Sequence, residues 1–198
     1  MSVDRILEDV KGELKKIPGI GEKTANRMIY HFLEQSPEEV SALARALATL
    51  KEKIRFCSAC FNYATADLCA ICQDPLRDRG TICVVSSPQD IMRIEETGVF
   101  NGLYHCLHGC ITPLRGIGPD DIHVNELLQR LNSETKEVIL ALNSDYEGES
   151  TSFYIARLVA KKHVKVSRLA TGLPLGSLIE YIDTTTLKNA LDGRVMMY

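Results

Sequence analysis

Two pairs of cysteines constrain this chain more than any other feature of its sequence. Each pair has two residues between its members and eight residues separate the pairs, giving Cys57, Cys60, Cys69 and Cys72. The short spacing turns both sulfurs of a pair to the same side, so that four thiolates can surround one Zn²⁺ tetrahedrally. Because the protein fills all four positions, we expect one structural zinc per chain and no catalytic water on it.

Disulfide bonds are the alternative use of such cysteines. The charged start Met1–Asp4 does not resemble a secretion signal, so we expect a cytoplasmic protein whose thiols bind metal. No apolar run approaches the roughly 20 residues of a membrane span, and we expect no membrane contact.

Residues 1–56 carry helical patterning. Apolar residues at steps of three and four predict helices over residues 3–14 and from residue 22, and Ser36–Glu39 begins a third helix with a capping box. The predicted core positions of the second and third helices are Ala25, Met28, Ile29, Phe32, Leu33, Val40, Leu43, Leu47, Leu50 and Ile54. Since three short helices bury little surface, we expect this part to lean on the zinc unit or on another subunit.

The turn before the second helix has the composition of a phosphate-binding site. Gly19 and Gly21 permit a tight turn and a close backbone approach, and Lys23 and Arg27 project from the helix that follows. These residues resemble a helix-hairpin-helix motif, which implies contact with the DNA backbone and no base readout. The alternative is an ordinary helical hairpin with solvated cations. A formal net charge of −3 requires any such binding to be local.

Beyond residue 76 short apolar runs alternate with helical stretches. Strands are predicted at 81–85, 103–107, 138–142 and 164–169, with a helix over 149–162. Continuous apolar strands separated by helices indicate a parallel sheet covered on both faces. We expect no second metal site at the histidines and cysteines of residues 105–110. Side chains alternate between the two sides of a strand, so these four groups would not converge on one ion.

An acidic loop follows the third of these strands. Asp145, Glu147 and Glu149 lie where a parallel sheet places its sites, and their oxygens suit Mg²⁺. Alternatively, Glu147 and Glu149 complement the dipole of the helix that begins there, and the spacing does not decide between the two roles.

This α/β part resembles the Toprim domain, in which a Glu after the first strand and an Asp-x-Asp-x-x-Gly run gather catalytic Mg²⁺. Here Ser86 or Ser87 takes the place of the Glu, and Asn143 takes the place of the first Asp. A site with an amide and a hydroxyl in place of two carboxylates lacks charge to hold two ions, so catalysis is not expected. The alternative function is a small Mg-dependent Toprim nuclease.

The order of hairpin, four-cysteine unit and altered Toprim part resembles the bacterial recombination mediator family RecR over the whole chain, as do Gly172–Gly176 and Gly193–Arg194 in the tail. The resemblance implies an α/β Toprim-like parallel sheet with a helical head and a small four-cysteine zinc finger. It also implies four parts, namely residues 1–56, 57–76, 77–170 and 171–198.

The same resemblance implies a non-enzymatic protein of the bacterial cytoplasm and nucleoid. Such a protein forms a tetrameric ring on DNA and works with RecO, and with RecF in many bacteria, to load RecA. Lys23 and Arg27 match the DNA-contacting hairpin of the family. Asp145, Glu147 and Glu149 lie in its acidic patch, which is a candidate for partner docking.

Overall fold

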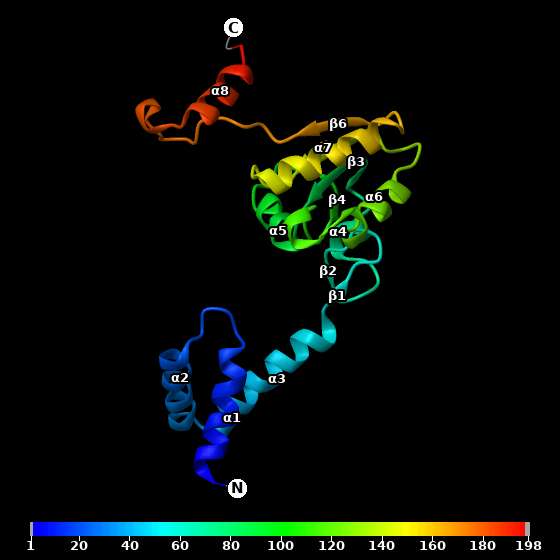
Figure 1. The fold of residues 1–198 in the computed structure, drawn as a ribbon. Coiled ribbons are helices and arrows are strands. Elements are labelled where there is room, and N and C mark those ends of the chain that lie inside the picture. Colours follow the sequence, from blue (N-terminus) through cyan, green and yellow to red (C-terminus); the bar gives the residue numbers. More distant parts are fainter. Residues whose placement is uncertain (1, 197–198) are drawn as a thin grey trace. The chain divides into compact units, whose positions relative to one another are not determined.

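The computed structural model describes residues 2–196 and divides into two compact units between Ile54 and Arg55. Figure 1 gives the course of the chain through both units. None of the helices in the described part combines the length and the apolar character needed to cross a bilayer.

The first unit consists of three helices, α1 (Val3–Lys15), α2 (Glu22–Glu34) and α3 (Pro37–Lys53). Helix α1 packs against α2, which buries Ala25 and Ile29. Gly19 has a φ of 83° in the turn between these helices, a conformation that favours glycine. The predicted capping box is present, because Ser36 Oγ accepts from Glu39 N at 3.3 Å and Ser36 N donates to Glu39 Oε2 at 3.0 Å.

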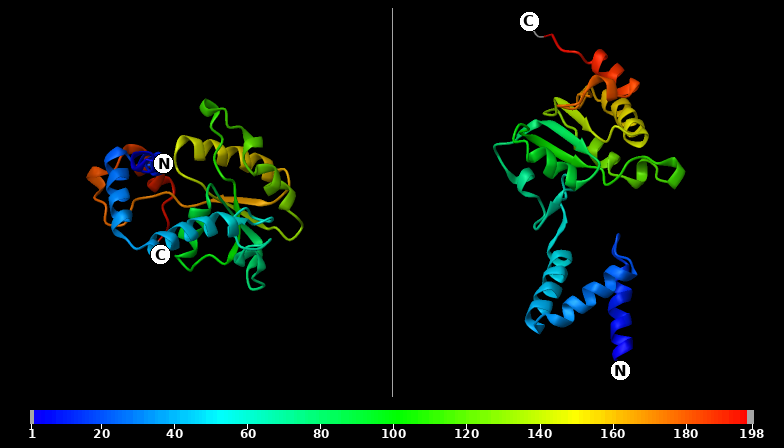
Figure 2. Two further views of the ribbon diagram at one scale, coloured as in Figure 1. Left: turned by 90° about the horizontal axis from the view of Figure 1, so that it is seen from below. Right: turned by 90° about the vertical axis from the view of Figure 1, so that its left-hand side faces the viewer.

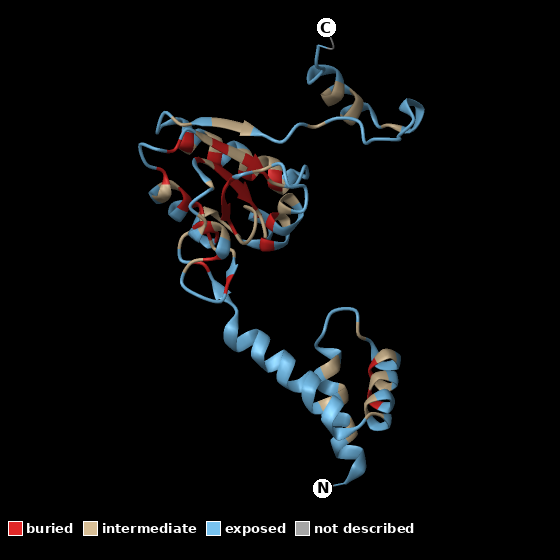
Figure 3. Ribbon diagram, turned by 180° about the vertical axis from the view of Figure 1, so that it is seen from behind, coloured by how far each residue is buried: buried red, intermediate tan, exposed pale blue. Residues whose placement is uncertain are grey.

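The predicted apolar stripe of α3 is not buried, which corrects the expectation from the sequence. No residue of α3 is buried, and the helix is coloured as exposed along most of its length in Figure 3. Leu47, for example, is 63% exposed. Leu33 of α2, also predicted as core, is 66% exposed. The exposed members of the α3 stripe are Leu43, Leu47, Leu50 and Ile54. Periodicity identified an amphipathic helix correctly, but the other two helices of this unit do not cover its apolar face.

The second unit begins with the cysteine module. Strand β1 (Arg55–Phe56) pairs antiparallel with β2 (Tyr63–Ala64), and a short helix α4 (Ala70–Gln73) follows. The buried residues of this module are Cys57, Cys60, Ala64, Cys69 and Cys72.

A four-stranded parallel sheet follows, as predicted. Its strands are β3 (Asp78–Val85), β4 (Gly102–Cys106), β5 (Glu137–Ala141) and β6 (Lys165–Arg168), in the spatial order β4-β3-β5-β6. The connecting helices are α5 (Pro88–Glu95), α6 (Val124–Arg130) and α7 (Tyr146–Ala160), with short 3₁₀ turns η1 (Pro113–Arg115) and η2 (Pro119–Asp121). Figures 1 and 2 show α7 lying across this sheet.

The two faces of the sheet are covered in different ways. One face packs on α6 and α7 through Leu127, Ile155 and Val159. The other packs on Ile91 of α5 and on two residues of the cysteine module, Phe61 and Ile71. The module therefore completes the covering of the sheet. The last described segment holds η3 (Ile179–Tyr181) and α8 (Thr184–Asp192), and none of its residues is buried. Residues 197–198 of the predicted tail lie outside the described residues.

Replacing Leu127 with alanine tests the core between the sheet and α6. Leu127 is fully buried, so we expect Leu127→Ala to lower the free energy of unfolding by about 2–5 kcal/mol. Leu114 is fully exposed on η1, and Leu114→Ala is the matched control, with an expected change of about 0.5 kcal/mol or less. Urea unfolding followed by circular dichroism measures both. Equal losses in the two variants would contradict the assigned core.

Candidate functional site

The four predicted cysteines come together in one buried cluster. Their sulfur atoms all lie within 4.8 Å of one another, and Cys60 Sγ is 3.5 Å from Cys69 Sγ. Four sulfurs at about 2.3 Å from a tetrahedral zinc ion are separated by about 3.8 Å, so the cluster has the right size for the ion. Within residues 2–196 this is the one group of three or more Cys, His, Asp or Glu residues close enough to hold a metal.

The thiols of this cluster influence one another's ionisation. Their hydrogen bond raises the pKa of Cys60 and lowers the pKa of Cys69, as expected when the Cys60 thiol donates to a Cys69 thiolate. A second thiolate beside the first is unfavourable because the charges repel. A bound dication removes this repulsion and deprotonates the coordinating thiols, so the donor set suits Zn²⁺.

The first cysteine pair is fixed to strand β4 and to the loop behind it. Cys106 N donates to Cys60 O at 2.8 Å, and His108 Nε2 lies 2.7 Å from Phe61 O. The ring of Phe61 stacks on His123, with 3.7 Å between centroids and 12° between planes. Phe61 is thus occupied with packing inside the protein.

The glycines of the hairpin have different roles. Gly19 needs its positive φ, whereas Gly21 is extended, and a Cβ there would meet no atom within 4 Å. The fold of the unit therefore does not require glycine at position 21. Gly21 is the N-cap of α2 and offers no side-chain cap, so the first N–H groups of the helix lack an acceptor from it.

The cations around the hairpin divide into paired and unpaired groups. Lys11 and Lys15 both form ion pairs with Glu22, at 3.3 and 2.6 Å, and Lys16 pairs with Glu13 at 2.7 Å. Among residues 2–196 neither Lys23 nor Arg27 has an acidic partner, although both are exposed on α2. Of the five cations around the hairpin, Lys23 and Arg27 are therefore the two whose charge no carboxylate in the described residues offsets.

A cleft of about 420 Å³ lies at the carboxyl ends of β3 and β5. Asn143, Asp145, Glu147 and His108 are among the residues that line it. Asp145 is the N-cap of α7, and its Oδ1 accepts from Gly148 N at 2.7 Å. A Cβ at position 148 would lie 2.1 Å from Asn143 O, so this turn requires glycine.

The predicted acidic patch is divided in the structure. Glu149 is absent from the residues that line the cleft and instead pairs with Arg168 of β6 at 3.2 Å. Ser86, in the position of the Toprim Glu, donates through Oγ to Asp90 Oδ2 at 2.9 Å. Ser87 bonds the same carboxylate in the capping box of α5. The cleft therefore contains two acidic side chains, Asp145 and Glu147, among its lining residues.

Sequence reasoning did not assign two residues that the structure brings to these sites. His108 received no site role from the sequence, yet it lines the acidic cleft and its Nε2 lies 2.7 Å from the carbonyl oxygen of Phe61. Arg130 has an Nη2 atom 3.9 Å from Cys72 Sγ, although 58 positions separate the two residues. No local spacing connects either residue to its site, so only the fold reveals them.

Four family models match consecutive stretches of the chain. They describe a RecR helix-hairpin-helix (residues 7–51), a RecR zinc finger domain of the four-cysteine type (54–74), a Toprim domain (80–170) and a RecR C-terminal part (172–195). The predictions of a structural zinc and of the fold class are confirmed by these matches together with the cysteine cluster and the parallel sheet.

Similar curated proteins cover nearly the whole chain. A protein of Tropheryma whipplei named Recombination protein RecR is 47% identical over 191 residues, which is 96% of each chain. One with the same name from Acidothermus cellulolyticus is 50% identical over 96% of each chain. A third, from Lactobacillus delbrueckii subsp. bulgaricus, is 51% identical over 90% of this chain and 91% of its own.

The zinc content of the purified protein tests the cysteine cluster. We expect one zinc per chain, and we expect Cys69→Ser to lose it because hydroxyl oxygen is a poor substitute for thiolate. Cys110→Ser is the matched control, since Cys110 is a half-buried cysteine outside the cluster. Elemental analysis measures the zinc. Full zinc in Cys69→Ser, or loss of zinc in Cys110→Ser, would contradict the assigned ligands.

Proposed function

The chain belongs to the RecR family of recombination proteins, and from this membership we propose that it is a non-catalytic mediator that binds DNA without sequence preference. We propose further that it forms a tetrameric ring on DNA in the bacterial cytoplasm and, with RecO and RecF, promotes the loading of RecA. The proposal of DNA binding rests mainly on one observation. Lys23 and Arg27, which have no acidic partner in the described residues, lie beside the start of α2, where Gly21 offers no side-chain cap.

The hairpin has the features that a phosphate requires. Lys23 and Arg27 supply charge that no carboxylate in the described residues neutralises, and the start of α2 supplies N–H groups and a positive dipole end. Gly21 has no side chain, and the space where a Cβ would lie is open. A ligand can therefore approach the N–H groups at the start of α2 without obstruction. Such contacts position a protein on the DNA backbone and carry no base information.

Exposed apolar surface supports assembly with other copies. The α3 stripe carries four large exposed side chains, and the tail exposes a further group. The exposed apolar residues of the tail are Leu173, Leu175, Leu178, Ile179, Tyr181, Leu191, Val195 and Met196. Contiguous exposed apolar surface is unfavourable in water and marks interaction sites. An assembly of several chains buries it, and a closed ring keeps weak phosphate contacts at high local concentration on DNA.

The acidic cleft is better suited to docking than to phosphoryl transfer. Asn143 and Ser86 replace two carboxylates, and Asp145 already holds the start of α7 through Gly148. Two-metal catalysis needs a fuller set of oxygen anions to hold its ions. We propose that Asp145 and Glu147 instead contact a basic surface of a partner protein such as RecO.

Replacing Lys23 and Arg27 together tests the DNA-binding proposal. We expect Lys23→Ala/Arg27→Ala to weaken binding about equally for all DNA sequences. A plot of the logarithm of the DNA association constant against the logarithm of the salt concentration has a negative slope. This slope should become less steep by about one unit for each phosphate that the protein no longer neutralises. Fluorescence anisotropy with labelled DNA at several salt concentrations measures both effects.

The control for this pair is Lys16→Ala. Lys16 lies near the same turn but already pairs with Glu13, so we expect its removal to change the salt slope by less than half a unit. If the double variant binds DNA with the wild-type slope, the hairpin is not the DNA contact.

Neutralising the cleft tests the docking proposal. In Asp145→Asn/Glu147→Gln the asparagine keeps the capping function, so the fold should be retained. We expect RecO binding to fall by about tenfold or more while DNA binding is unchanged, because charge pairs at interfaces contribute strongly. Glu149→Gln is the control, since Glu149 pairs with Arg168 away from the cleft. Mg²⁺-dependent DNA cleavage by the wild type that disappears in the double variant would instead favour a nuclease.

A further inference from the structure

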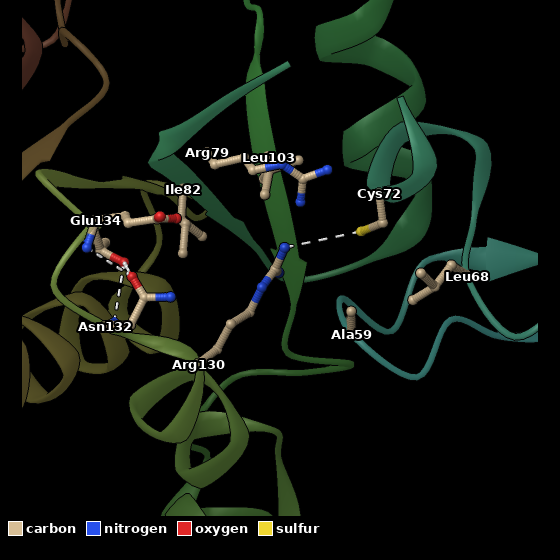
Figure 4. A pocket seen from close by; sticks show the side chains of 10 residues that line it. Ala59, Leu68, Cys72, Arg79, Ile82, Leu103, Arg130, Asn132 and Glu134 are labelled. Atoms are coloured by element: carbon tan, nitrogen blue, oxygen red, sulfur yellow. Dashed lines mark hydrogen bonds between the residues drawn. The ribbon is translucent and has the colours of Figure 1, made fainter. Parts of the chain in front are cut away.

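Arg130 connects the zinc cluster to the α/β sheet. It is the last residue of α6, and its side chain extends toward Cys72 (Figure 4). Nη1 donates to the carbonyl oxygen of Tyr104 on β4, and Nη2 lies 3.9 Å from Cys72 Sγ. The planar guanidinium therefore spans a strand of the sheet and one ligand of the cluster. A guanidinium presents its donors in a fixed fork, which suits two acceptors at once.

The charge of the loaded zinc site gives this contact its significance. Four thiolates and one Zn²⁺ carry a net charge of −2, and all four cysteines are buried. Burying a net charge is costly unless a charged or hydrogen-bonding partner offsets it. Arg130 has no carboxylate partner within residues 2–196, so its full positive charge faces the cysteine sulfur.

The two cysteine pairs are attached to the sheet in different ways. The first pair uses a backbone hydrogen bond, from Cys106 N to Cys60 O at 2.8 Å. The second pair reaches the same strand through Arg130, which contacts Cys72 and the carbonyl of Tyr104. A simpler role for Arg130 is to complement the dipole at the end of α6. That role does not explain why both of its hydrogen bonds are to other elements.

We propose that Arg130 is a positioning residue of the zinc centre, which donates to the Cys72 thiolate and holds the second cysteine pair against β4. The consequence is a slower release of zinc than the four cysteines alone would give. Partners of metal ligands in other proteins typically contribute about 10- to 100-fold in metal affinity. The two acceptors, Tyr104 O and Cys72 Sγ, lie on different elements. The role therefore requires the two N–H groups of a planar guanidinium as well as its positive charge.

The rate of zinc transfer to a chromogenic chelator tests this role in the full-length protein. We expect Arg130→Gln to release zinc about 10- to 100-fold faster than the wild type. Arg79→Gln is the matched control, because Arg79 lines the same cavity of about 200 Å³ without a hydrogen bond to a cysteine among the described residues. We expect its release rate to stay within about twofold of the wild type.

A spectroscopic measurement separates a contact with the thiolate from a general loss of structure. In the Co²⁺-substituted protein, losing an N–H donor makes the Cys72 sulfur a better electron donor. The sulfur-to-cobalt charge-transfer band of Arg130→Gln should therefore move to lower energy, while that of Arg79→Gln stays in place. A role in packing alone would change the release rate without moving the band.

Two results would overturn the proposal. One is an unmoved band in Arg130→Gln, and the other is equal zinc release from Arg130→Gln and Arg79→Gln. If Arg130→Gln does not fold, Arg130→Lys decides the matter. Its ammonium group keeps the charge but reaches only one of the two acceptors, so we expect zinc release several-fold faster than in the wild type. A wild-type rate in Arg130→Lys would then refute the role of the fork.

Discussion

The packing of the cysteine module on one face of the parallel sheet is the interaction on which the second unit depends. A parallel sheet must be covered on both faces, and α5 alone covers only part of the face opposite α6 and α7. Phe61 and Ile71 of the module pack beside Ile91 of α5 on that face. Since the module is too small to have an apolar core of its own, zinc binding supplies the folding energy that keeps this cover in place.

The same packing relates the metal centre to the acidic cleft. Phe61 directly follows the zinc ligand Cys60, and its carbonyl contacts His108, which lines the cleft. Both Phe61 and His108 have φ values near 60°, a conformation unusual for side chains of this size. Such backbone strain persists only where surrounding contacts hold it. The cysteine module thus helps to position His108 in the wall of the cleft, although the acidic side chains of the cleft come from the loop after β5 and the first turn of α7.

Local spacing was sufficient to predict the features that depend on neighbouring residues. The cysteine pairs, the capping box at Ser36 and the four strands of the parallel sheet all follow from patterns within a few residues. The α3 stripe was predicted as core and is exposed, because periodicity shows that a face is apolar but not what covers it. Glu149 and Arg130 depend on partners far away in the sequence, so their contacts could not be read from spacing.

The acidic cleft combines a well-defined backbone turn with few acidic side chains. Glycine is required in this turn, since Gly148 approaches Asn143 O too closely for any side chain, and Asp145 caps α7. These features stabilise the turn whether or not a metal binds, because Asp145 accepts a hydrogen bond from a free N–H group at the start of α7. Two positions of the cleft carry no charge, since Ser86 donates to Asp90 and Asn143 is an amide. A rigid turn with two remaining carboxylates is suited to present them to a basic partner surface, which requires defined geometry but no ion.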